Sequence, residues 1–146
     1  MIDDSDQLQS KKDQINNLDL SMIADAMARR LKWLPSEVNE ACQYYKNFLF
    51  LNYKYPKEII VPSTDIDEVW HNHILDTKKY RFDCKTIFGK YLDHYPYFGM
   101  DAHSTREDLS NAFKRTQALH VQEFNYPIKS TAYTKFSRLI RRFLGD

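Results

Sequence analysis

The sequence predicts an all-α fold, a single-domain bundle of five to six helices with a helical hairpin at its centre. Apolar residues recur at helical spacing in successive segments, and no two runs alternate in the way that paired strands require. Only 3 glycines and 5 prolines interrupt the 146 residues, which favours long regular elements. The hydrophobic content of 42% fits one globular domain with a buried core.

In the first part of the chain, the sequence predicts a polar segment followed by two helices. Residues 1–16 are polar and carry charges of both signs, so we expect a loose arm or a weak helix there. Residues 18–31 and 36–52 each place their apolar side chains on one helical face, which predicts two amphipathic helices. Residues 53–61 contain Pro56 and a short apolar run, and we expect an extended connector.

Two further helices are expected to form the central hairpin. In residues 64–75, Thr64 and Asp67 have the spacing of a capping box, with Asp in place of the usual Glu. The next helix is expected over residues 78–92, with Asp76 or Thr77 as its cap. Because only a short turn separates the two segments, we expect them to fold back on one another.

The last part of the chain predicts two more helices. Ser104 and Glu107 have the spacing of a capping box, which predicts a helix that begins there and continues to about residue 124. Residues 132–144 combine an apolar stripe with lysine and arginine, which is typical of a basic amphipathic helix. We therefore expect three parts: a polar arm at 1–16, a helical domain at 17–127, and a C-terminal basic helix at 128–146 packed on that domain.

Charge and composition narrow the class of protein. The formal net charge of +1 gives no strong signal for nucleic-acid binding, and two cysteines do not make a disulfide framework. The polar N-terminus has no apolar core of a signal peptide, and no window approaches the ~18 apolar residues of a membrane span. We expect a soluble cytoplasmic protein without a transmembrane segment; a signal-independent export route stays open.

Residues 61–99 concentrate the side chains that can bind metals or transfer protons. They hold three of the five histidines and one of the two cysteines. Asp67 and His71 are four residues apart and share one helical face, which suits two ligands of one metal or an Asp that orients a His. His71 and His73 point about 200° apart on a helix, so only one should face the site. We expect it to be His71, because it shares its face with Asp67.

A hairpin would bring four metal-ligating residues within reach of one another: Asp67, His71, Cys84 and His94. This combination of nitrogen, sulfur and oxygen ligands suits zinc, and iron is possible on the same residues. Four protein ligands would make a structural site. If Asp67 only orients a histidine, three ligands leave one position open for water, as in hydrolytic zinc sites. The residues expected to flank or support the site are Asp65, Trp70, His73, Tyr80 and Pro96.

Two other readings of the same residues stay open. In the first, the protein is a metal-free interaction module with a buried Asp/His/Cys polar network, and the aromatic loop 95–98 or the basic C-terminal helix contacts a protein partner. In the second, Cys84 is the nucleophile of an enzyme and His71 or His94 activates it. The sequence itself identifies neither the partner nor a reaction.

The spacing of these residues resembles that of the glycine-rich-domain-containing-protein-like family, a domain of unknown function. The shared pattern reads P-x-x-x-I-D-x-V-W-H, then I-L-x-T-x-x-Y-x-x-x-C, then F-G-x-x-x-x-H-x-P, from Pro62 to Pro96. The resemblance covers roughly residues 18–99 and implies a short helical protein but no established activity. The family often has a second histidine where this chain has Asp93, and another residue in place of His73. Both departures favour His71 and His94 as the functional members.

Overall fold

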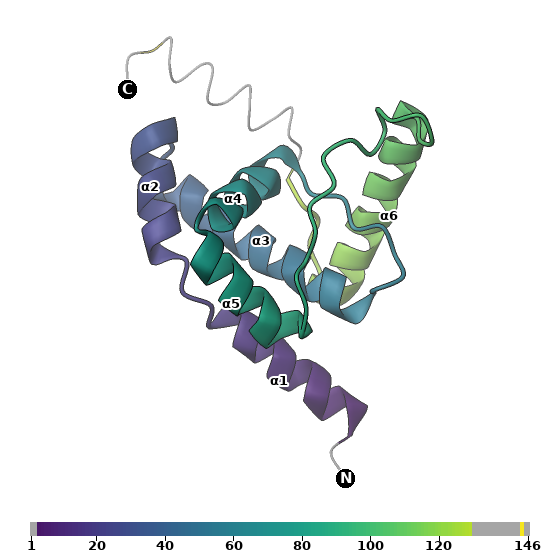
Figure 1. Cartoon of the computed structure of the whole chain (residues 1–146), viewed down its shortest axis with the longest axis horizontal. Helices are drawn as coiled ribbons and strands as arrows, with labels where there is room; N and C mark the ends of the chain where they lie inside the picture. The colour runs from purple at the N-terminus through teal and green to yellow at the C-terminus, as the bar shows by residue number, and fades with distance from the viewer. Residues whose placement is uncertain (1–2, 130–143, 145–146) are drawn as a thin grey trace.

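The computed structural model describes residues 3–129 and residue 144. Within this part of the chain the prediction of an all-α fold is confirmed, and no strand is present. The helices pack around one another in a bundle (Figure 1). Their bounds are α1 Asp4–Asn16, α2 Ser21–Leu31, α3 Pro35–Lys54, α4 Thr64–Leu75, α5 Thr77–Phe88 and α6 Arg106–Phe124.

Helix α3 is the centre of the bundle, and α1, α2, α4 and α6 all pack against it (Figure 1). Its side chains Tyr45 and Leu51 have no exposed surface, and Phe48 is 1% exposed. Burying a large apolar side chain stabilises a fold by about 1.5–3 kcal/mol. The ten buried residues of α3 therefore make it the main contributor to the core.

The N-terminal segment forms a 13-residue helix, α1, that contacts α3 and α5. Its Ile15 is 1% exposed and belongs to the core. Lys11 Nζ donates to the carbonyl oxygen of Ile87 at 2.9 Å, and that carbonyl lies in the last turn of α5. A cation at this position complements the negative end of the helix dipole. The sequence signal was weak because few residues of this helix are apolar.

Helix α4 begins one residue earlier than the capping pattern predicts. Ser63 is the N-cap, and its Oγ accepts a hydrogen bond from the backbone N–H of Ile66 at 3.2 Å. The prediction that Thr64 caps the helix was wrong. Helix α5 ends at Phe88 and not at residue 92, because Gly89 adopts a left-handed conformation with φ of 71° that favours glycine.

The capping box of α6 is also shifted by one residue. Thr105 Oγ1 accepts from the backbone N–H of Asp108, whose carboxylate accepts in return from the Thr105 N–H. The predicted Ser104 instead donates to Asp101 and accepts from the Gly99 N–H at 2.7 Å. Ser104 thereby closes part of the loop between α5 and α6, the loop that carries His94.

Two further predictions concern the C-terminal helix and helices that could span a membrane. The basic helix predicted over 132–144 lies outside the described residues. Within the described part of the chain, no helix is long and apolar enough to cross a membrane.

Candidate metal centre

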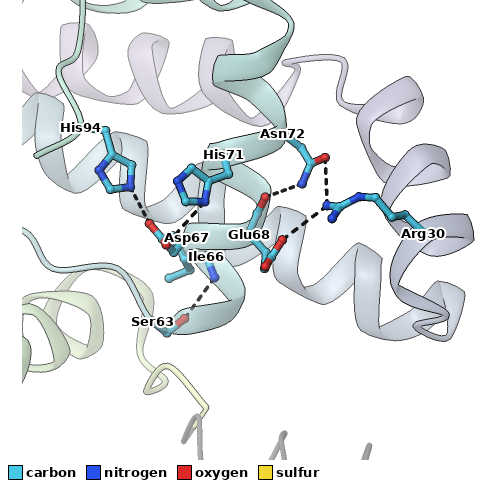
Figure 2. Close-up of polar contacts among 8 residues, drawn as sticks. All are labelled: Arg30, Ser63, Ile66, Asp67, Glu68, His71, Asn72 and His94. Atoms are coloured by element: carbon cyan, nitrogen blue, oxygen red, sulfur yellow. Dashed lines mark hydrogen bonds and ion pairs between the residues drawn. The ribbon is translucent and has the colours of Figure 1, made fainter. Parts of the chain in front are cut away.

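The candidate site lies where α4 meets the loop that follows α5 (Figure 2). Asp67 and His71 project from the same face of α4, as their four-residue spacing predicts. His94 reaches them from the loop, with its Nε2 2.6 Å from Asp67 Oδ1. His71 Nδ1 lies 3.8 Å from the other carboxylate oxygen, Oδ2. The Asp67 carboxylate thus lies between two imidazoles.

These three residues form a group that could hold a metal ion. One ligand atom from each lies within 4.8 Å of the other two. Two ligand atoms bound to one tetrahedral zinc at about 2.0–2.2 Å lie roughly 3.3–3.6 Å apart. His71 Nδ1 and Asp67 Oδ2 are close to that separation, and the His71 side chain is 56% exposed, so it has the freedom to adjust. His94 Nε2 and Asp67 Oδ1 are closer than that, so their hydrogen bond would have to open if these two atoms became ligands.

The His94 ring is close to two other rings. Its centroid lies 4.1 Å from that of the Trp70 ring, at an interplanar angle of 24°. The His71 ring is nearly parallel to it, with centroids 5.2 Å apart and an interplanar angle of 9°. Trp70 is 6% exposed and part of the core, so it forms a rigid wall for His94. The stacking orients the imidazole so that its Nε2 points at Asp67.

Tyr80 connects this wall to the loop that carries His94. The Trp70 Nε1–H donates to the Tyr80 hydroxyl at 2.9 Å. The same hydroxyl donates to the backbone carbonyl of Leu92, two residues before His94. Burial raises the pKa of Tyr80, so its hydroxyl keeps the proton that it donates. One side chain of α5 thus positions both the ring that stacks on His94 and the backbone that leads to it.

Cys84, the predicted fourth ligand, is not in the three-residue group. It is 2% exposed, and the hydrogen-bond partners of its sulfur are the Tyr80 hydroxyl and the backbone of Leu92. Burial raises the pKa of the thiol, which disfavours the thiolate needed for metal binding or nucleophilic attack. Tyr80 and Cys84 are one helical turn apart on α5 and together hold the Leu92 backbone.

His73 points away from His71, as their spacing predicts, and is 1% exposed. Its Nδ1 lies 2.6 Å from the Tyr45 hydroxyl, and its Nε2 lies 2.8 Å from Asp83 Oδ2. A neutral imidazole that donates from Nε2 and accepts at Nδ1 satisfies both partners. Burial lowers the pKa of His73, and the Asp83 carboxylate opposes that shift in part. His73 is therefore a structural core residue that links α4 to α3 and α5.

Of the two remaining predicted flanking residues, Pro96 lies beside the group, whereas Asp65 is not among the residues that line the cavity. Asp65 is half-buried in the first turn of α4, one turn before Val69. Pro96 lines the cavity beside His94. On the opposite side of α4, Arg30 of α2 lies 3.6 Å from Glu68 and donates to Asn72 at 3.3 Å (Figure 2). These contacts join α2 to the helix that carries Asp67 and His71.

A cavity of about 600 Å³ opens directly onto the three-residue group. Asp67, His71 and His94 form part of its wall. The rest comes from residues 58–64, from the loop at 93–100, and from single residues of three helices: Asn52, Trp70 and Leu109. Sequence analysis missed this cavity, because its walls come from segments far apart in the chain that carry ordinary apolar side chains.

Comparison with known proteins identifies the family. The sequence pattern of the UCP032817-like family matches residues 6–139. Glycine-rich domain-containing protein 1 of Arabidopsis thaliana is 32% identical over 94 residues, which are 60% of this chain. Those residues are 11% of the plant protein, so the chain spans a small part of that relative. No solved structure matches the chain. With most of its length matched, this chain belongs to the UCP032817-like family.

Proposed function

We propose that Asp67, His71 and His94 bind one divalent metal ion, zinc or iron(II), and that the cavity beside them receives the molecule on which the metal acts. The observation that carries the proposal is the mutual approach of three ligand-type atoms within 4.8 Å at the mouth of a cavity. The set departs from the predicted one, because Cys84 is left out and Asp67 becomes a direct ligand.

The ligand types favour an open site over a closed structural one. Two histidines and one carboxylate hold catalytic zinc in hydrolases, where the fourth position carries water. The same combination holds iron(II) with open positions in oxygenases. Structural zinc sites are closed by four protein ligands and are usually rich in cysteine. A three-ligand set that lines a cavity fits the activation of a bound water molecule.

Metal content of the purified protein tests the proposal. We expect elemental mass spectrometry to find close to one zinc or iron per chain in the wild type. His71→Ala should lose the metal, because it removes one of three ligands and its exposed side chain leaves the core intact. His103→Ala removes an exposed histidine outside the group and should keep the metal.

The variant Cys84→Ser distinguishes the proposed three ligands from the four predicted from the sequence, because only the four-ligand set includes Cys84. We expect this variant to retain metal in proportion to its folded fraction, measured by circular dichroism on the same samples. Equal metal content in the wild type and in His71→Ala, with or without added zinc or iron, would overturn the proposal.

The second candidate is a metal-free interaction module, and one observation favours it. Asp67 and His94 are in direct contact at 2.6 Å, so this ion pair satisfies both groups without a metal. The exposed Tyr95 and Tyr97 in the loop beside them would then contact a protein partner. A protein that stays metal-free after zinc or iron is added would support this candidate. Both proposals include a cytoplasmic location. The free thiols of both cysteines are consistent with it, because a reducing compartment keeps cysteines unpaired.

A further inference from the structure

The cavity beside the candidate metal centre has the size of a site for a small organic molecule. Its volume of about 600 Å³ falls within the range of roughly 300–1,000 Å³ that is usual for such sites. Most of its lining is apolar or aromatic, with the carboxylate and the imidazoles gathered at one place in the wall. That arrangement suits a ligand with an apolar body and a polar end.

Apart from its two histidines, the ionisable side chains in the lining are carboxylates and a tyrosine. No lysine or arginine lines the cavity, whereas three carboxylates do: Glu58, Asp67 and Asp93. Glu58 is paired with Arg115 at 3.0 Å, and Asp67 is paired with His94. Asp93 is exposed, and within residues 3–129 no ion pair occupies it. A negative ligand would therefore meet repulsion, and a positive one would find a partner in Asp93.

The rim of the cavity offers apolar surface that water now covers. Ile59 is 56% exposed, Tyr95 57% and Met100 72%. Exposed apolar side chains gathered around a cavity indicate a binding surface more than scattered ones do. The Tyr95 ring adds a π face close to Asp93 in the sequence, and such faces attract organic cations.

We propose that this cavity binds apolar organic amines, with Asp93 as the counter-charge and the apolar rim around the body of the ligand. As a substrate site the cavity depends on the proposed metal centre. As a binding site it does not, because neither Asp93 nor the rim residues belong to the three-residue ligand set. In the metal-free protein, a phosphate ester or a carboxylic acid is the wrong class of ligand for this lining.

Three probes of one shape and different charge test the proposal: 2-(1-naphthyl)ethylamine, 2-(1-naphthyl)ethanol and 1-naphthaleneacetate. Isothermal titration calorimetry is carried out on the full chain, once after chelator treatment and once after loading with zinc. In the chelated protein we expect the amine to bind about three- to tenfold more tightly than the alcohol, since partly exposed ion pairs and cation–π contacts are modest. The carboxylate should bind most weakly.

Two variants locate the binding, each with a matched control. Asp93→Asn should bring the affinity for the amine down to that for the alcohol, whereas Asp25→Asn, an exposed aspartate on α2, should leave the ratio unchanged. Met100→Ser should weaken amine and alcohol alike, whereas Met22→Ser removes a similarly exposed methionine, 81% exposed, away from the cavity.

The outcomes separate this proposal from the proposed metal site. If the protein prefers the amine but binds no metal, the cavity proposal is supported and the metal proposal is contradicted. If it binds metal but shows no preference for the amine, the metal proposal is supported and the cavity proposal is contradicted. Equal or tighter binding of the carboxylate in the chelated protein, or an amine preference that survives in Asp93→Asn, would overturn the cavity proposal.

Discussion

Histidines in this protein have separate tasks that depend on burial. His120 has no exposed surface, accepts from Asn47 Nδ2 at its Nε2 and donates from Nδ1 to the Tyr126 carbonyl at 2.7 Å. Both bonds fit the neutral imidazole alone, because a protonated Nε2 would face an amide that can only donate. Burial accordingly lowers the pKa of His120. His73 shows the same direction, whereas His71 is largely exposed and available to a ligand.

The buried histidines predict a loss of stability in mild acid. Below about pH 6.5, the ordinary value for an imidazole, the unfolded chain takes up protons at His73 and His120 that the folded protein does not. The free energy of unfolding should therefore fall as the pH falls from about 7.5 to about 5.5. Urea denaturation at each pH measures this slope.

His120→Gln provides the matched test of that prediction. It should flatten the slope, because one of the two buried imidazoles no longer titrates, whereas His103→Gln at an exposed position should not. A slope of equal steepness in His120→Gln and the wild type would contradict the assignment.

The burial of both cysteines predicts that their thiols react slowly in the folded protein. Cys42 is 8% exposed and Cys84 is 2% exposed, and burial raises the pKa of both thiols. Since the thiolate is the reactive form, neither should react readily with Ellman's reagent in the native protein. Both should react in denaturant. One fast thiol in the native protein, lost in Cys84→Ser, would revive the cysteine-dependent enzyme.

Among the elements, α5 positions the candidate site without contributing a ligand. Its Tyr80 is hydrogen-bonded to Trp70 and to the Leu92 carbonyl, and its Cys84 lies against the same backbone. This arrangement explains the Y-x-x-x-C spacing seen in the sequence. The two side chains hold the loop after Gly89 so that His94 returns to α4.

Tyr80→Phe tests this positioning role. The change removes the acceptor of the Trp70 N–H and the donor to Leu92, and a buried polar group left without a partner costs about 1–3 kcal/mol. Urea denaturation should show a loss of this size. Metal affinity should also fall, by roughly 10–100-fold, as when outer hydrogen bonds of a metal site are removed.

Tyr97→Phe is the control, because its side chain is 59% exposed and its ring is retained. It should change neither quantity. Unchanged metal affinity in Tyr80→Phe, measured under conditions where the variant is folded, would show that Tyr80 contributes only to stability.

Across the whole molecule, the sequence predicted the elements better than their contacts. Periodic apolar stripes identified the helices from residue 18 to 124, and the four-residue spacing placed Asp67 beside His71. The N-caps of α4 and α6 were missed by one residue, because Ser63 and Thr64, or Ser104 and Thr105, are equally able caps in a sequence. The prediction that the α3 helix starts at Ser36 was also wrong, since Leu34 is the N-cap and Pro35 is the first helical residue.

The candidate site was predictable in part. Ligand-type residues are visible in a sequence, but the direction of the loop after α5 is not. That direction depends on Gly89 and on the bonds of Tyr80 to Leu92, which bring His94 to the site. Cys84 lies in the interior beside Tyr80 and the Leu92 backbone, and it is not part of the three-residue group. The cavity was out of reach for the same reason, since its walls meet only in three dimensions.

X-ray absorption spectroscopy of the zinc-loaded protein tests the central claim most directly, because it reports the atoms bound to the metal. We expect the zinc ion to be surrounded by nitrogen and oxygen atoms only, at about 2.0–2.2 Å, with the multiple-scattering signature of two imidazoles. A sulfur neighbour at about 2.3 Å would mean that Cys84 is a ligand and would contradict the three-residue site. A spectrum of hydrated zinc alone would contradict the metal centre altogether.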